Sequence, residues 1–208
     1  MISHFKIYGE RNSGTNYVQW LFETNFKLEY WRSGALGWKH GMAQLDEIRQ
    51  GDYNHVLFLL VLKNPYSWLL SMHKNPHHAT HLKRFPFNRF CLSPWQSYYS
   101  KPRAPIPGEG FDNIFKLRSA KVGSQLGVLD AASNALLINY EALLADTEGF
   151  VTSAAEQFKL PQSEQFFTST SSYHMGQKRT YGKVFNRQAY YLDFEVEEAA
   201  GYQALQSL

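Results

Sequence analysis

Residues 7–18 read Ile7-Tyr8-Gly9-Glu10-Arg11-Asn12-Ser13-Gly14-Thr15-Asn16-Tyr17-Val18. The stretch enters as a short apolar strand, passes through a polar turn with two glycines, and continues with an apolar spacing that predicts a helix from Thr15 to about Glu23. A strand, a turn and a helix N-terminus in this order direct backbone N–H groups and the positive end of the helix dipole to one point. The stretch therefore predicts an anion-binding loop. An ordinary glycine turn that caps a helix is the alternative interpretation.

The two glycines have the spacing of a Walker A loop, but the residues that follow do not fit that motif. It requires a lysine and then a serine or threonine, where this chain has Thr15 and Asn16. The loop therefore lacks the lysine that reaches β- and γ-phosphates and the hydroxyl that holds Mg²⁺. We expect it to bind a phosphate-like group without ATP or Mg²⁺, with charge from Arg11 and further side-chain donors from Ser13, Thr15 and Asn16.

The composition is typical of a single domain over residues 1–208. The chain has 208 residues, of which 44% are hydrophobic, and this is enough for a packed core. Its net charge of +3 favours small anionic ligands and is too weak to indicate a nucleic-acid partner. The one cysteine, Cys91, excludes an intramolecular disulfide and fits a reducing compartment. Because the N-terminus has no signal-peptide pattern and the longest apolar run is too short to cross a bilayer, we expect a cytoplasmic protein with no membrane partner.

Strands alternate with helices along the chain, which predicts an α/β fold with a parallel central sheet and flanking helices. Residues 56–62 have the length and composition of a buried parallel strand, and a helix is predicted over 66–73 with Pro65 in its first turn. A second buried strand is predicted over 135–140. Further predicted elements are an edge strand within 34–41 and helices at 43–49, 111–126, 150–158 and 195–208. Ligands of such sheets bind at the carboxyl ends of the strands.

The segment 74–110 differs from the rest of the chain because it is rich in prolines, histidines and aromatic residues. We expect irregular structure with short helices, which serves as a lid or an acceptor-side insertion. A metal site is an alternative, on the histidines His73, His77, His78 and His81. Pro76 interrupts their helical spacing and no acidic or cysteine ligands cluster nearby, so we expect no metal.

Three further polar stretches carry candidate chemistry. Lys63 ends a strand and Ser71 lies two turns into the next helix, so both can face one anion. Lys39-His40 places a general base beside a charge that stabilises a transition state. The basic loop 177–183 can close over a bound anion. Taken singly, each stretch is equally a solvated or incidental surface group.

In their order along the chain, these stretches resemble the P-loop sulfotransferase family, which uses 3′-phosphoadenosine 5′-phosphosulfate (PAPS). Residues 12–15 resemble the 5′-phosphosulfate loop, and Lys63-Asn64-Pro65 with Ser71 resembles the 3′-phosphate motif. Lys39-His40 resembles the catalytic turn, Tyr140-Glu141-Ala142-Leu143 a strand end of the family, and Gly182-Lys183 its late glycine-rich loop. The segment 74–135 has no counterpart. The implied cofactor-binding residues are Arg11, Asn12, Ser13, Gly14, Thr15, Asn16, Lys63, Ser71, Tyr140, Arg179, Gly182 and Lys183.

The resemblance implies a P-loop nucleoside triphosphate hydrolase-like architecture and in-line transfer of a sulfuryl group from PAPS to a hydroxyl or amine, without a metal. His40 would take the proton of the acceptor, and the backbone N–H groups of 13–16, with Arg11 or Lys39, would offset the developing charge. Two departures concern charge. The lysine of the family's loop falls on Asn12, which completes the implied catalytic set, and the arginine of its 3′-phosphate motif falls on Lys63.

Two other functions remain open. Asn12 in place of a cation favours a non-catalytic module that binds a nucleotide or a glycan. A P-loop kinase is the other alternative, on the spacing of the loop glycines, but the missing Walker lysine argues against it. The expected acceptor is a small molecule or a carbohydrate, because arginines and aromatic rings are mixed within 83–99.

Overall fold

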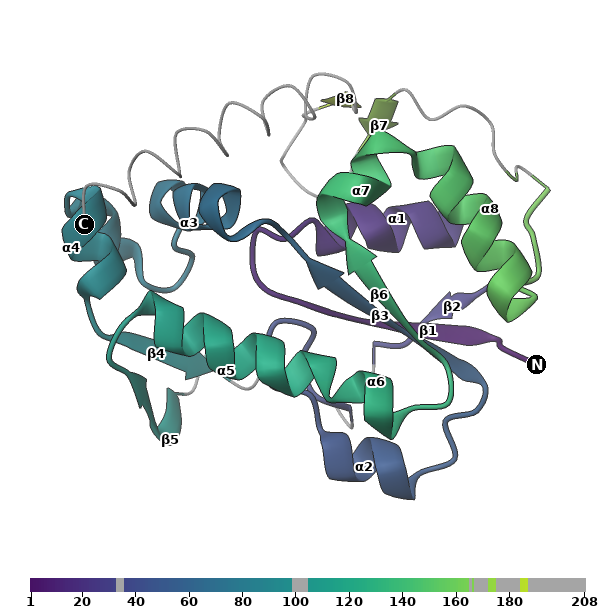
Figure 1. The fold of residues 1–208 in the computed structure, drawn as a ribbon, viewed down its shortest axis with the longest axis horizontal. Coiled ribbons are helices and arrows are strands. Elements are labelled where there is room, and N and C mark those ends of the chain that lie inside the picture. The colour runs from purple at the N-terminus through teal and green to yellow at the C-terminus, as the bar shows by residue number, and fades with distance from the viewer. Residues whose placement is uncertain (33–35, 99–104, 165, 167–171, 175–183, 187–208) are drawn as a thin grey trace.

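A four-stranded parallel sheet forms the centre of the fold, with the strand order β2–β1–β3–β6 (Figure 1). The computed structural model describes residues 1–32, 36–98, 105–164, 166, 172–174 and 184–186. The strands are β1 (His4–Gly9), β2 (Glu29–Tyr30), β3 (Val56–Leu62) and β6 (Ala135–Asn139), and each neighbouring pair is parallel. The predicted α/β class with a parallel central sheet and flanking helices is therefore confirmed.

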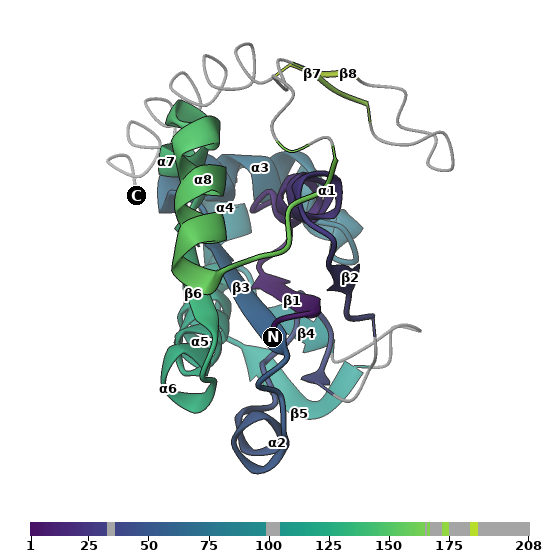
Figure 2. The ribbon, with the colours of Figure 1, turned by 90° about the vertical axis from the view of Figure 1, so that its right-hand side faces the viewer.

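Helices cover both faces of this sheet (Figure 1, Figure 2). One face carries α1 (Thr15–Asn25), α7 (Tyr140–Ala145) and α8 (Thr147–Phe158), and the other carries α2 (Leu45–Gln50), α5 (Ile114–Leu126) and α6 (Val128–Ala131). Because strand side chains alternate, Phe5 and Ile7 of β1 join the first core and Tyr8 joins the second.

A lobe beside the sheet is built from the described residues within 65–111. It contains α3 (Pro65–Lys74), the 3₁₀ helix η2 (Thr80–Arg84), α4 (Phe87–Leu92) and the antiparallel strands β4 (Trp95–Tyr98) and β5 (Pro105–Phe111). Trp68, Leu82, Phe90 and Trp95 form its buried centre together with the first turns of α5. This bears out the expectation of irregular structure with short helices, whereas the β4–β5 pair was not predicted. The strands β7 (Ser172–His174) and β8 (Val184–Asn186) form a separate antiparallel pair.

The edge strand lies earlier in the chain than the sequence predicts. Glu29 and Tyr30 pair with His4 and Phe5, whereas the described residues 36–41 form a turn closed by a hydrogen bond from Gly41 N to Trp38 O of 2.8 Å. The predicted helix over 195–208 and the basic loop 177–183 lie outside the described residues. Within the described ranges, no helix has the length and apolar character needed to cross a membrane.

Candidate functional site

The carboxyl ends of three parallel strands bring the predicted segments to one edge of the sheet. β1 leads into the loop 10–14, β3 into Lys63-Asn64, and β6 directly into Tyr140 of α7. The register pairs Gly9 with Val61 and Leu62 with Asn139, so the three strands end side by side. The sequence therefore located the edge of the sheet correctly.

The loop presents the start of α1 to this edge. Gly14 has a φ of +88°, a conformation that suits glycine, and an added Cβ would lie 2.2 Å from Cε2 of the Tyr140 ring. Tyr140 is buried and packs directly against the loop backbone. Among the described residues, none accepts a hydrogen bond from the backbone N–H groups of Gly14, Thr15 and Asn16. The first N–H groups of a helix lack intrahelical partners, so this end of α1 can bind an anion.

Two loop side chains serve the loop itself. The Ser13 hydroxyl is buried and donates to the carbonyl of Glu10 at 2.7 Å. Thr15 is also buried, with its methyl group against Gly9, where an added Cβ would lie 2.6 Å from it. In this conformation Ser13 braces the turn, and the backbone provides the donors that face outward.

Asn12 connects the loop to the end of α3. Its φ of 64° lies in the left-handed region, which asparagine tolerates better than most residues. Its amide nitrogen donates to the carbonyls of Ser71 (3.2 Å) and Asn75 (3.1 Å) and lies 3.2 Å from the sulfur of Met72. Its amide oxygen lies 3.1 Å from Nε2 of His77. Asn12 therefore satisfies carbonyls at the C-terminus of a helix, a role that the sequence did not reveal.

The two residues predicted for a second anion are in contact. Nζ of Lys63 donates to Oγ of Ser71 at 3.1 Å, across the first two turns of α3. Asn64 caps this helix by accepting from Tyr66 N at 2.8 Å, and Pro65 stands at its first position. The spacing of eight residues therefore does bring the lysine and the serine together.

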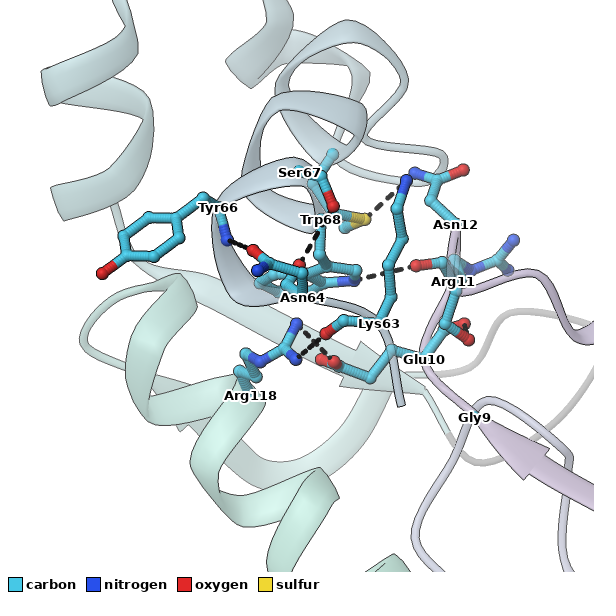
Figure 3. A network of polar contacts seen from close by, with 12 residues as sticks. Gly9, Glu10, Arg11, Asn12, Lys63, Asn64, Tyr66, Ser67, Trp68 and Arg118 are labelled. Atoms are coloured by element: carbon cyan, nitrogen blue, oxygen red, sulfur yellow. Dashed lines mark hydrogen bonds and ion pairs between the residues drawn. The ribbon is translucent and has the colours of Figure 1, made fainter. Parts of the chain in front are cut away.

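Arg118 of α5 binds the ends of β1 and β3 together, and the sequence did not identify it (Figure 3). Its guanidinium lies 2.8 Å from Oε2 of Glu10, donates to the carbonyl of Lys63 at 2.7 Å, and lies 4.4 Å from the centre of the Trp68 ring. The Trp68 indole in turn donates to the carbonyl of Arg11 at 2.9 Å. Both candidate anion-binding segments therefore share one support.

Glu10 is an almost fully buried carboxyl at the base of the loop. Burial raises its pKa to about 7, and the charges of Arg118 and Lys121 oppose this shift. The signal available for Arg118 was its place among the cations Lys116, Arg118 and Lys121 of the helix predicted over 111–126, but its partner Glu10 lies in another part of the sequence.

The turn 38–41 places His40 directly beside the loop. The backbone N–H of Gly9 donates to the carbonyl of Lys39 at 2.9 Å, and Nδ1 of His40 lies 2.8 Å from the carbonyl of Gly9. A carbonyl can only accept, so Nδ1 carries the hydrogen and Nε2 keeps its lone pair. Burial, and then the charge of Lys39, lower the pKa of His40 well below its ordinary value. At neutral pH the imidazole is therefore an uncharged proton acceptor.

Two cations flank the same turn. Nζ of Lys39 donates to Oδ1 of Asn16 at 2.7 Å, in the first turn of α1. The Arg11 guanidinium lies 4.7 Å from the centre of the Trp38 ring. Each is therefore close to the loop, while Arg179, Gly182 and Lys183 lie outside the described residues.

Three of the four histidines of the metal hypothesis have separate hydrogen-bonding partners, and the fourth, His81, is exposed on η2. Nε2 of His73 lies 2.9 Å from the carbonyl of Phe85, Nε2 of His78 lies 2.9 Å from the carbonyl of Gln96, and His77 contacts Asn12. Within the part of the chain that the structure describes, no three metal-ligating side chains gather.

Comparison with protein-family models, with curated proteins and with solved structures finds no match to this chain.

Proposed function

We propose that the protein is a sulfotransferase that moves a sulfuryl group from PAPS to a hydroxyl or amine acceptor. The observation that carries this proposal is the meeting of two anion sites and one base at a single sheet edge. The N-terminus of α1 provides one site, the contact of Lys63 with Ser71 marks the other, and His40 is hydrogen-bonded to Gly9 between β1 and the loop. A donor with a phosphosulfate at one end of its nucleoside and a phosphate at the other matches this pair of sites.

The residues present fit such a donor. The backbone N–H groups of residues 14–16 would hold the 5′-phosphosulfate, and Lys63 with Ser71 would hold the 3′-phosphate. The donor supplies a sulfuryl group on a stable phosphate leaving group. Lys39 and Arg11 would offset the charge that grows on the leaving oxygen, because both lie beside the loop.

His40 would act as the general base. As the acceptor oxygen bonds to sulfur, its proton moves to Nε2, and the electron pair of the broken S–O bond stays on the 5′-phosphate. In the protein without a ligand, the lowered pKa of His40 keeps Nε2 unprotonated. A bound anionic donor would offset the positive field of Lys39 and Arg11, and this would raise the basicity of His40 for the reaction.

Binding and transfer test the proposal together. Calorimetry should show tighter binding of adenosine 3′,5′-bisphosphate than of AMP or ATP, because Lys63 and Ser71 are assigned to the 3′-phosphate. Radiolabelled sulfate from PAPS should then pass to an acceptor in a screen of phenols, sugars and amines. Equal affinity for the three nucleotides would show that Lys63 and Ser71 do not bind the 3′-phosphate.

The variant His40→Ala separates the base from the donor site. Donor affinity should change by less than about twofold, while turnover falls roughly a hundred- to ten-thousand-fold, the usual contribution of a positioned base. Unchanged turnover would exclude His40 from this role.

A non-catalytic binding module is the second candidate, and Asn12 favours it. This residue stands where the resembled family has a loop lysine, and its amide is occupied by the carbonyls of Ser71 and Asn75. Donor binding without transfer to any acceptor would support this module. Transfer activity that is lost in Lys39→Met or Arg11→Met would instead identify the cation that replaces the lysine.

A further inference from the structure

One part of the sequence contains no acidic residue. Residues 53–108 hold none of the 18 Asp and Glu of the chain but include 7 of its 21 Lys and Arg. The small net charge of +3 therefore hides a strong asymmetry between this part and the rest. This stretch also forms the lobe of α3, η2 and α4.

The lobe presents four of these seven cations to solvent, while Lys63 is buried. We call the exposed side chains Lys74, His81, Lys83, Arg84 and Arg89 the basic ridge. Across the described residues, no carboxylate forms an ion pair with any of them. The charges of the basic ridge are therefore not neutralised by ion pairs with described side chains.

Two arginines of the ridge are held in place by one ring. The guanidinium of Arg89 lies 4.0 Å from the centre of the Phe85 ring, and that of Arg84 lies 5.8 Å from the same centre. The carbonyl of Phe85 is itself bound to Nε2 of His73 on α3 at 2.9 Å. Stacked guanidinium groups lose less freedom on binding, and their forked donors suit carboxylate and sulfate groups.

The ridge is joined to the candidate site through α3. Lys74 ends the helix whose Ser71 contacts Lys63, and His77 follows it and contacts Asn12 of the loop. η2 and α4 pack on the same helix through Leu82 and Phe90, and Figure 1 shows α3 and α4 next to one another. A chain-like ligand could therefore place one unit at the loop and further units on the ridge.

We propose that the basic ridge binds an acidic polysaccharide, a chain of sugars that carry carboxylate or sulfate groups, as the acceptor of the reaction. Its role as acceptor rests on the proposed function, whereas the binding surface does not. Sugar hydroxyls supply the atoms that a sulfotransferase would modify. Nucleic acid is a poorer fit, because the exposed large apolar side chains among the described residues are Met1, Leu92, Leu129 and Leu137, and none is an aromatic ring on which a base can stack.

Fluorescence anisotropy with labelled polygalacturonate and labelled dextran sulfate tests the surface. The variant Lys83→Gln/Arg84→Gln/Arg89→Gln should bind both probes at least about tenfold more weakly. The slope of the logarithm of the binding constant against the logarithm of the salt concentration should also decrease, by the amount that corresponds to the loss of about three ionic contacts. Neutral dextran should not bind. The matched control Lys27→Gln/Arg32→Gln/Arg49→Gln removes one lysine and two arginines from exposed positions elsewhere, and it should stay within about twofold of the unmodified protein.

Equal losses in the two triple variants would show a general charge effect and overturn the ridge as a site. Tighter binding of single-stranded RNA than of either polysaccharide would overturn the choice of partner. Adenosine 3′,5′-bisphosphate binding is measured on the same samples and should be unchanged in both variants, which also shows that they are folded. Polysaccharide binding without bisphosphate binding would leave the surface in place and reject the proposed reaction.

Discussion

The two faces of the central sheet differ in what they bury. Toward α1, α7 and α8, the strands present only apolar side chains, among them Phe5, Ile7 and Leu59, and each is fully buried. The buried polar side chains of α1 and α8, which include Asn25 and Thr147, are uncharged. Toward α5 and α6, the core also encloses charged groups, which are Lys6 and Glu10 from the β1 segment and Lys121 from α5, and the amide of Gln125.

This difference suggests that one face mainly stabilises the fold and that the other supports the candidate site. Apolar burial stabilises the fold at every pH, whereas buried charges cost free energy unless they are paired. The buried charged groups lie on the side of the sheet that supports the loop and His40, since Glu10 opens the loop and Arg118 reaches both strand ends. We expect variants on the first face to change stability alone, and variants on the second to change stability in a way that depends on pH.

The largest effect is expected on the apolar face. Phe5→Ala should lower the free energy of unfolding by about 3–5 kcal/mol, because it leaves a cavity among fully buried side chains. Urea denaturation measures this, with the exposed residue Leu137 as a control: Leu137→Ala should cost less than about 0.5 kcal/mol. Equal losses in the two variants would contradict the assignment of this face as the stabilising core.

The next effect depends on pH and concerns Glu10. Its carboxyl loses a proton near pH 4.5 in the unfolded chain and near pH 7 in the folded protein, so the folded state binds more protons between these values. The free energy of unfolding of the unmodified protein should be compared with that of Glu10→Gln. The advantage of the unmodified protein should be complete below pH 4.5 and should fall by about 3 kcal/mol as the pH rises from 4.5 through 7. Urea midpoints of both proteins across this range measure it. A rise with pH would show that the ion pair with Arg118 outweighs burial.

A smaller loss is expected for Arg118. Arg118→Ala removes the partner of a buried carboxyl, but that carboxyl can take up a proton, so the cost at pH 7 should be about 2 kcal/mol. Arg118→Lys keeps a charge without the fork and should lose about half as much. If both variants are as stable as the unmodified protein, the contacts of Arg118 with Glu10 and Lys63 do not support the fold.

The smallest effect has the opposite sign. The Gln125 amide is fully buried, and neither its oxygen nor its nitrogen has a hydrogen-bond partner among the described residues. Gln125→Met keeps the length of the side chain and should raise the free energy of unfolding by about 1 kcal/mol, because it removes an unsatisfied polar group. A destabilised Gln125→Met protein would show that the polar group on this face contributes to stability.

Local sequence was enough to predict the parts of the fold that depend on local patterns. The apolar run of β3, the proline that starts α3 and the glycine turn before α1 each carried their own signal. The edge strand was placed too late, because β2 has only two residues and is defined by its pairing with β1.

The sequence predicted the parts of the candidate site that directly follow the ends of neighbouring parallel strands. Lys63 lies just before the start of α3 and Ser71 lies about two turns into it, so their contact follows from a helix that begins directly after the strand. Arg118 and Glu10 could not be paired from the sequence, since only the folded chain brings them together. The role of Asn12 depends on its left-handed backbone, which residue identity alone does not reveal.

The shared guanidinium of Arg118 has a consequence for ligands with two anionic groups. Because it holds the Glu10 carboxyl and the Lys63 carbonyl at once, the spacing between the loop and Lys63 is set before any ligand arrives. A bisphosphate that matches this spacing meets its second site at a high effective concentration once the first is bound. Its affinity should then exceed what the two monophosphates bound separately would predict, and a linker of the wrong length between the phosphates should lose the gain.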